Sequence, residues 1–332
     1  MNELETVDLA PDLNICRILN GMWQVSGTHG QIEPSAAILS MIDYHRKGFI
    51  TWDLADIYGP AESYIGEFRE QLGSNEHKSF QALTKFVPNP GPMTRNIVEY
   101  HIDESLKKMN TSTLDLVQFH WWDYDDLNYL DALTHLFELK EKEKIKQIGL
   151  TNFDTRRIEI MFENDLHPIS NQVQYSILDQ RPEIKMTPFC LKNNMSLLCY
   201  GTLLGGYLSE KYLGVSEPTR MDMDTASLQK YKNMIDEWGG WNLFQELLVV
   251  LDEIAKKHNS SIANVSVRFI LNKPAVAGVI IGTRLSLSKH MDENLRVFRL
   301  SLDDSDYSKI NSITAKANDL FKIIGDCGDE YR

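Results

Sequence analysis

The sequence lacks the features that mark several large classes of protein. It has only four cysteines in 332 residues, and none of them forms a Cys-x-x-Cys pair. We therefore expect buried free thiols in a reducing compartment. No apolar run approaches the ~20 residues of a membrane helix, and the stretch from Met1 to Ala10 lacks the basic and apolar regions of a signal peptide. These absences predict a cytoplasmic protein with no membrane partner.

Positive charge is also scarce. Lysine and arginine together number 34 against 47 aspartates and glutamates, which gives a formal net charge of −13. A surface of this sign repels the phosphates of nucleic acid, so we expect no nucleic-acid partner. An anionic ligand would need a local basic site.

Two binding motifs are missing as well. A doubly wound nucleotide-binding fold would carry a Gly-x-Gly-x-x-Gly between its first strand and helix, and none is found there. His120 has no second metal ligand nearby at suitable spacing except Asp123, which we interpret as a turn residue. The sequence therefore predicts no metal site.

What the sequence does contain is a regular alternation of short apolar runs and amphipathic segments. The runs expected to form strands are 17–23, 49–53, 80–86, 114–120, 146–150, 170–175, 195–200 and 275–282. Helices are expected between them, including 243–258 and 261–271, and the stretch 207–242 interrupts the repeat. Eight such units without a break in composition predict one α/β domain over residues 1–332, a (β/α)8 TIM barrel. An N-terminal β-hairpin at 7–18, a final barrel helix at 285–297 and a C-terminal helix at 303–316 complete the expected fold.

Four polar residues stand out against this pattern: Asp53, Tyr58, Lys85 and His120. Asp53, Lys85 and His120 lie at or near strand ends, and Tyr58 lies in the loop after Asp53. Because strand ends meet at one face of a barrel, the four can share a pocket. A phenol that donates a proton, a lysine that lowers the phenol pKa, an aspartate that holds the lysine and a histidine that orients a carbonyl would suit carbonyl reduction.

The motif Asp-x4-Tyr, the strand lysine and the strand histidine resemble the aldo-keto reductases in order and spacing, over roughly Arg17 to Asn294. The resemblance implies that the protein reduces a small aldehyde or ketone with NADPH, NADH being the less favoured cofactor. It implies that Thr151, Asn152 and Gln172 bind the nicotinamide carboxamide and that Tyr200 stacks on the ring. Gly201-Thr202-Leu203 stands where the family usually has Ser-Pro-Leu, ahead of Gly205 in the pyrophosphate loop.

The remaining implied positions fall at both ends of the cofactor and around the substrate. Arg284, with Lys289 or His290, is expected to bind the adenosine phosphate. The other cofactor residues implied are Gly21, Met22, Trp23, Asp53, Gly282, Thr283, Glu293 and Asn294. Trp23, Trp121 and Trp122 are expected to line the substrate pocket.

Two other hypotheses stay open beside the reductase. One is a regulatory or redox-sensing subunit that binds NADPH, like the potassium-channel β subunits that resemble this family. The other is a catalytically idle barrel, which the intact set of four polar residues disfavours. The chain is expected to be a monomer or a weak homo-oligomer.

Overall fold

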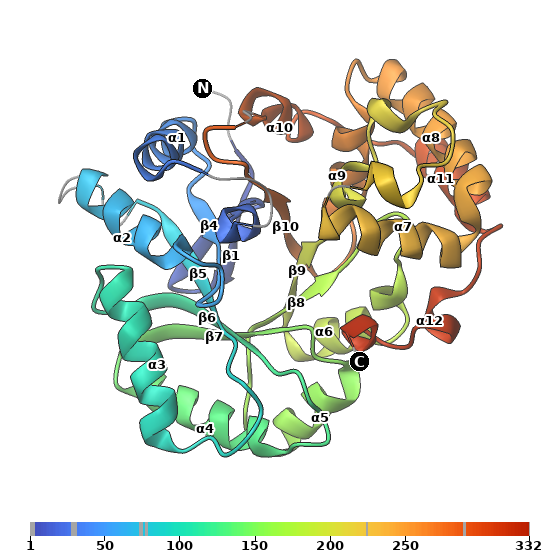
Figure 1. Cartoon of the computed structure of the whole chain (residues 1–332). Helices are drawn as coiled ribbons and strands as arrows, with labels where there is room; N and C mark the ends of the chain where they lie inside the picture. Colours follow the sequence, from blue (N-terminus) through green and yellow to red (C-terminus); the bar gives the residue numbers. More distant parts are fainter. Residues whose placement is uncertain are drawn as a thin grey trace.

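A computed structural model describes residues 4–27, 32–72, 76, 79–223, 225–287 and 290–331. Eight parallel strands form a closed barrel in the order β10-β3-β4-β5-β6-β7-β8-β9, as the sequence predicted. The helices surround it (Figure 1). The barrel strands are β3 (Ile18–Gly21), β4 (Thr51–Asp53), β5 (Gln81–Phe86), β6 (Leu114–His120), β7 (Ile145–Thr151), β8 (Ser170–Gln174), β9 (Ser196–Tyr200) and β10 (Val276–Gly282).

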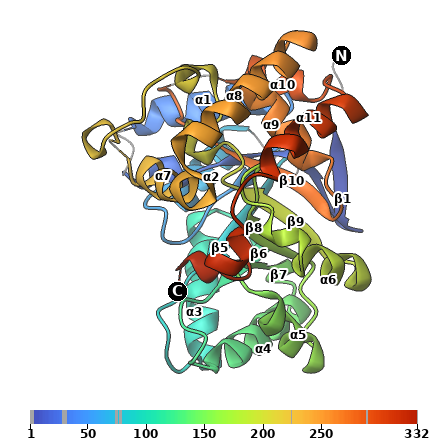
Figure 2. The ribbon, with the colours of Figure 1, turned by 90° about the vertical axis from the view of Figure 1, so that its right-hand side faces the viewer.

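The predicted hairpin closes one end of the barrel. Its strands β1 (Thr6–Ala10) and β2 (Leu13–Cys16) are antiparallel. Figure 2 shows β1 on one side of the barrel and the C-terminal end of the chain on the other. Apolar side chains of the hairpin pack against inward-facing side chains of the barrel strands in one cluster: Leu9, Leu13, Ile15, Leu19, Leu83, Leu116, Leu198 and Ala277. The hairpin thus seals the barrel interior, and the opposite end is left for a site.

The helices begin and end where local chemistry favours it. Glu33 accepts hydrogen bonds from the Ser35 and Ala36 N–H groups ahead of α1, with Pro34 in its first turn. The helices are α1 (Pro34–Arg46), α2 (Ala61–Leu72), α3 (Arg95–Lys108), α4 (Asn128–Glu141), α5 (Thr155–Glu163), α6 (Met186–Asn193), α7 (Ala226–Trp238), α8 (Gly240–Lys257), α9 (Ile262–Leu271), α10 (Met291–Val297), α11 (Asp304–Thr314) and α12 (Leu320–Ile323). Among the described residues, no helix is both long and apolar enough to cross a bilayer.

Three segments differ from the prediction. The helix expected from residue 285 begins only at Met291, where Asp292 and Glu293 place negative charge in its first turn. The irregular stretch 207–242 contains α7, which begins after the Thr225 side chain accepts a hydrogen bond from the Leu228 N–H. After α11 the chain adds α12, which packs against α7, and a turn at Asp329–Tyr331.

Candidate active site

The site is built on a buried ion pair between Asp53, the last residue of β4, and Lys85 in β5. Lys85 Nζ donates to Asp53 Oδ1 at 2.9 Å, to Asp53 Oδ2 at 2.7 Å and to the Leu54 carbonyl oxygen at 3.0 Å. Burial lowers the pKa of Lys85, and the Asp53 carboxylate opposes that effect. An ammonium has three N–H donors, so these contacts use all of them.

Two glutamines that face the barrel interior complete this pair. Gln118 Nε2 donates to Asp53 Oδ1 at 2.9 Å. Gln172 Nε2 donates to the same oxygen at 2.6 Å and to Gln118 Oε1 at 2.7 Å. The sequence prediction missed Gln118, although it lies two residues before His120 on β6 and so shares its face of the strand. Gln172 was expected to bind a carboxamide; both of its N–H groups are used inside the barrel, which leaves its oxygen for a ligand.

Tyr58 lies next to the ion pair, in the loop between β4 and α2. Lys85 Nζ is 5.1 Å from the centre of the Tyr58 ring, and the Trp23 ring packs edge-on with its centre 5.1 Å away. Burial raises the pKa of Tyr58 well above that of an ordinary phenol, and the charge of Asp53 adds to the rise. This direction is opposite to the lowering by Lys85 that the sequence led us to expect. Asp53 neutralises the ammonium, and no Lys85 N–H is left for the phenol oxygen.

His120 and two tryptophans form the rim of the site. His120 is buried and packs against Trp122, with ring centres 4.3 Å apart. Trp122 and Trp23 are 42% and 39% exposed, so both can contact a substrate. Trp121 is wholly buried, and its Nε1 donates to the Asp126 carbonyl oxygen. The prediction that Trp121 lines the pocket is wrong, because alternation along the extended chain turns it away from His120 and into the core.

Thr151, Asn152 and Tyr200 continue the site on the other side of His120. Thr151 pairs with His120 in the strand register, and its buried Oγ1 has no hydrogen-bond partner within the described residues. The Tyr200 hydroxyl donates to Asn152 Oδ1 at 2.8 Å. An unsatisfied buried hydroxyl costs free energy, so a ligand that bonds it gains stability. The carboxamide of a nicotinamide fits these groups together with the oxygen of Gln172.

Small residues follow Tyr200, as expected of a phosphate-binding loop. Gly201 and Gly205 have φ values of +71° and +67°, which favour glycine. A Cβ on Gly201 would lie 2.5 Å from the Tyr231 hydroxyl oxygen, so α7 packs directly against the loop. Thr202 is buried and its Oγ1 donates to the Tyr175 carbonyl oxygen, while Leu203 packs partly into the core. These two residues can therefore offer a phosphate only their backbone.

The end expected to hold the adenosine lies where β10 meets β3. The Thr283 N–H and hydroxyl both donate to the Gly21 carbonyl oxygen at 2.8 Å. The absence of a side chain at Gly282 makes room for Gln24, whose Oε1 is a second buried acceptor without a partner among the described residues. The Met22 side chain is wholly buried, its N–H donates to the Asp53 carbonyl oxygen and its own carbonyl oxygen accepts from the Val25 N–H, so it presents no free donor.

Of the basic residues expected to bind the adenosine phosphate, the structure describes Arg284 and His290. Arg284 is exposed at the surface. His290 is also exposed and bonds the Glu293 carboxylate at 3.3 Å, which raises the pKa of the imidazole. Asn294 is buried one helical turn from His290, and its N–H donates to the His290 carbonyl oxygen. Lys289 lies outside the described residues.

The prediction missed a segment near the end of the chain, residues 326–331, that covers one side of the site. Buried Arg181 anchors it, donating to both Asp179 oxygens at 2.8 Å, to the Asp326 carbonyl oxygen at 3.0 Å and to Glu330 Oε2 at 3.0 Å. The Tyr200 hydroxyl lies 3.1 Å from the Tyr331 hydroxyl. The Tyr331 ring centre is 6.2 Å from that of Trp122 and 6.5 Å from that of His120. No periodicity or motif in the sequence indicated this placement.

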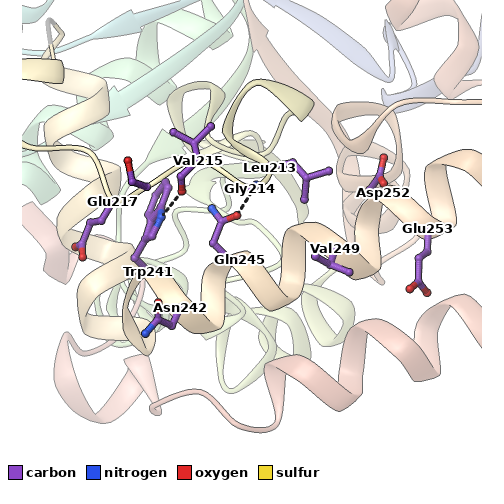
Figure 3. A pocket seen from close by; sticks show the side chains of 11 residues that line it. Leu213, Gly214, Val215, Glu217, Trp241, Asn242, Gln245, Val249, Asp252 and Glu253 are labelled. Atoms are coloured by element: carbon purple, nitrogen blue, oxygen red, sulfur yellow. Dashed lines mark hydrogen bonds between the residues drawn. The ribbon is translucent and has the colours of Figure 1, made fainter.

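A separate cavity of about 910 Å³ lies on the outside of the barrel. Figure 3 shows it between the loop at Leu213–Glu217 and α8, with Gln245 bonded to Gly214 and Trp241 bonded to Val215. None of its lining residues comes from a barrel strand, so it is distinct from the site at the strand ends. Within the described part of the chain, no group of His, Cys, Asp or Glu is arranged to hold a metal ion.

A closed parallel barrel with a buried acid–lysine pair, a phenol and an imidazole at one end defines a barrel oxidoreductase. The chain belongs to the aldo/keto reductase family, whose model matches residues 17–315. It is therefore an oxidoreductase that depends on NAD(P)H.

The chain is also similar to individual proteins. Aldo-keto reductase yakc of Schizosaccharomyces pombe, named with NADP+, is 26% identical over 84% of this chain and 81% of its own. The flagellar radial spoke protein 5 of Chlamydomonas reinhardtii is 32% identical over 47% of this chain, and the match spans only 33% of that protein. A crystal structure of an aldo/keto reductase from Klebsiella pneumoniae, in complex with NADP and acetate, superposes with a TM-score of 0.71 at 16% identity over 94% of this chain and 96% of its own. The last likeness supports the fold.

Proposed function

We propose that this protein reduces an aldehyde or ketone to the alcohol with NADPH, and that Tyr58 is the general acid. The observation that carries the proposal is the Asp53–Lys85 pair, buried next to the Tyr58 phenol at the end of the barrel where His120 also lies. This arrangement provides a proton donor and a hydrogen-bonding imidazole around one small volume. Trp23 and Trp122 provide apolar walls that exclude water.

A nicotinamide bound here would supply the hydride. Tyr58 donates its proton to the carbonyl oxygen as negative charge develops there, because an alkoxide is a much stronger base than a phenolate. The raised pKa of Tyr58 keeps the phenol protonated at neutral pH and so ready to donate. A His120 N–H orients the same oxygen, and the Asp53–Lys85 pair, with Gln118 and Gln172, keeps the wall of the site in place.

The chain's own residues would hold the cofactor along the strand ends. Thr151, Asn152 and the Gln172 oxygen would bind the carboxamide, and Tyr200 would stack on the ring. Arg284 would bind the adenosine 2′-phosphate, which supports NADPH over NADH, since a guanidinium can grip a phosphate with two parallel hydrogen bonds.

The test is steady-state turnover of NADPH with a panel of aldehydes and quinones. Tyr58→Phe should lower kcat by at least the ~100-fold typical of lost general acid catalysis, with the Kd for NADPH unchanged. In the wild type, the reduction rate should stay level through neutral pH and fall only above the ordinary phenol value of about 10, because the acid must be protonated to react.

Tyr64→Phe is a matched control, because Tyr64 is a buried tyrosine of α2, whose start follows the Tyr58 loop. Retained turnover in Tyr58→Phe would remove Tyr58 from its role. A wild type that binds NADPH but turns over no carbonyl compound would favour the regulatory subunit instead.

A further inference from the structure

One cation at the mouth of the site has no part in the reaction described above. Lys230 lies on α7, and its Nζ is surrounded by three tyrosine rings, with ring centres at 4.2 Å for Tyr331, 5.3 Å for Tyr200 and 5.5 Å for Tyr231. It also donates to the Tyr331 hydroxyl at 2.5 Å. The faces of aromatic rings attract a cation, so this cage holds the ammonium in place.

Lys230 differs from its neighbour on the same helix in how its charge is balanced. Lys232 bonds two carboxylates, Glu217 and Asp236, each at 2.6 Å. In the described ranges of the chain, no carboxylate lies within ion-pairing distance of Lys230. Glu330 lies nearby, with its Oε1 at 3.2 Å from the Tyr200 hydroxyl oxygen, but its carboxylate forms an ion pair with Arg181. Within those ranges, Lys230 thus has no carboxylate to balance its charge and two N–H donors that make no hydrogen bond, in a protein that is acidic as a whole.

The cage and the catalytic rim share Tyr331. The Tyr331 ring centre lies 4.2 Å from Lys230 Nζ and 6.5 Å from the His120 ring centre. The distance between Lys230 Nζ and the His120 ring centre therefore cannot exceed the sum of these two values. A small molecule whose carbonyl oxygen lies at Tyr58 and His120 can therefore extend past Trp122 and Tyr331 to Lys230.

We propose that Lys230 binds an anionic group of the substrate, so that the enzyme prefers carbonyl compounds that carry a carboxylate. A carboxylate accepts the two remaining N–H groups of Lys230, and such charge-assisted bonds are stronger than neutral ones. The cage fixes the ammonium before the substrate arrives, which reduces the entropy lost on binding. This inference rests on the proposed carbonyl reduction.

Another anion could reach the same cation. Tyr231 and Ser227, on the same helix as Lys230, pack against Gly201 and Gly205 of the expected pyrophosphate loop. Lys230 also contacts Tyr231, but its hydrogen bond and its shortest ring contact are both with Tyr331, on the side of His120 and Trp122, which favours the substrate over the cofactor. The experiment separates the two.

The test compares para-carboxybenzaldehyde with its methyl ester, which has nearly the same shape and no charge. The wild type should favour the acid in kcat/KM. Lys230→Gln should lower kcat/KM for the acid by about 10- to 100-fold, the equivalent of one charge-assisted hydrogen bond, and change the value for the ester by less than about twofold. Lys230→Arg should restore most of the preference, and Tyr331→Phe, which removes the hydroxyl that Lys230 bonds, should weaken it.

Lys256→Gln is the control for loss of one positive charge, because Lys256 is an exposed lysine of α8 that bonds Asp252 and, among the described residues, contacts no aromatic ring. The proposal is overturned if Lys230→Gln slows acid and ester equally, if the wild type does not favour the acid, or if the variant loses NADPH affinity with the acid-to-ester ratio unchanged. The last outcome would assign Lys230 to the cofactor. A wild type that reduces neither aldehyde refutes the carbonyl reductase proposal itself.

Discussion

The geometry around Tyr58 decides how a lysine can influence a neighbouring phenol. A free ammonium about 4 Å away would lower a phenol pKa by about three units at an effective dielectric near 20. Lys85 is instead bonded by both oxygens of Asp53, and burial raises the pKa of Tyr58. In the proposed reaction, Tyr58 would therefore stay protonated until negative charge develops on the carbonyl oxygen.

At this scale, sequence reasoning could place residues that lie at strand ends, but it could not place residues whose position depends on packing. Asp53, Lys85 and His120 were predicted because strand ends of a barrel meet. Gln118 could have been found, since it shares the His120 face of β6 by simple alternation. The roles of Tyr331 and Lys230 could not, because they depend on how a segment far along the chain folds back over the barrel.

Arg284 tests the preference for NADPH. Arg284→Ala should weaken NADPH binding by about 1.5 kcal/mol, the low end for a charge-assisted hydrogen bond because the residue is exposed, and leave NADH nearly unchanged. Titration of each cofactor by protein fluorescence measures this. Arg299→Ala, another exposed arginine just past α10, is the control. Equal losses for both cofactors would show that the phosphate pocket lies elsewhere.

At the scale of elements, the repeat of strand and helix was predictable and the pieces outside it were not. Each barrel strand is a short apolar run that the closed sheet buries, so composition alone marks it. The start of α10 depends on acidic residues after a turn, and the 326–331 segment depends on one buried arginine. Neither produces a hydrophobic period, which explains why the prediction extended one helix too far and omitted the segment.

The contacts of the 326–331 segment predict how much Arg181 contributes to the stability of the folded protein. Burial opposes the charge of this side chain, yet hydrogen bonds and attraction from Asp179 and Glu330 raise the pKa of Arg181. Arg181→Met should lower the free energy of unfolding by about 3 to 5 kcal/mol, because Asp179 and Glu330 are left buried without their partner. Glu330→Gln should lower the free energy of unfolding by less than Arg181→Met does, because Asp179 still binds the guanidinium.

Urea unfolding of both variants measures the order of these effects. Arg156→Met, which removes an exposed arginine with its pairs to Glu159 and Glu163, should change stability by less than about 1 kcal/mol. A larger loss in Glu330→Gln than in Arg181→Met would show that the segment is held by contacts other than this arginine.

For the molecule as a whole, the barrel has one end sealed with apolar side chains and one end lined with buried polar groups. The hairpin cluster around Leu13, Ile15 and Leu116 supplies hydrophobic burial at the sealed end. The polar end holds Asp53, Lys85, Gln118 and Gln172, whose hydrogen bonds largely satisfy one another but contribute less net stability. The buried polar and charged side chains, whose burial opposes folding, therefore lie at the end of the barrel where a ligand can bind. Because some of them titrate, the free energy of unfolding should depend on pH.

Asp56 provides the clearest case of that dependence. Its Oδ2 accepts from the Val87 N–H at 3.2 Å, while its buried Oδ1 has no hydrogen-bond partner in the part of the chain that the structure describes. Burial raises the pKa of Asp56 to about 6, and the charge of Glu62 adds to the rise. In the unfolded chain the carboxyl titrates near its ordinary value of about 3.9. The folded state therefore binds the proton more tightly, and the stability this provides is complete below pH 4 and lost as the pH rises through 6.

Asp56→Asn should remove this loss of stability at higher pH, because the amide stays neutral and its oxygen can still accept from the Val87 N–H. The variant and the wild type should differ little near pH 4, and the variant should gain relative to the wild type up to pH 6 or 7, by as much as ~2 to 3 kcal/mol for a shift of about two units. Urea unfolding at a series of pH values measures the difference, with Asp125→Asn, an exposed aspartate, as the control. A constant difference between Asp56→Asn and the wild type from pH 4 to 7 would mean that the Asp56 carboxyl is ionised in the folded protein throughout, and that the buried end of the barrel tolerates its charge.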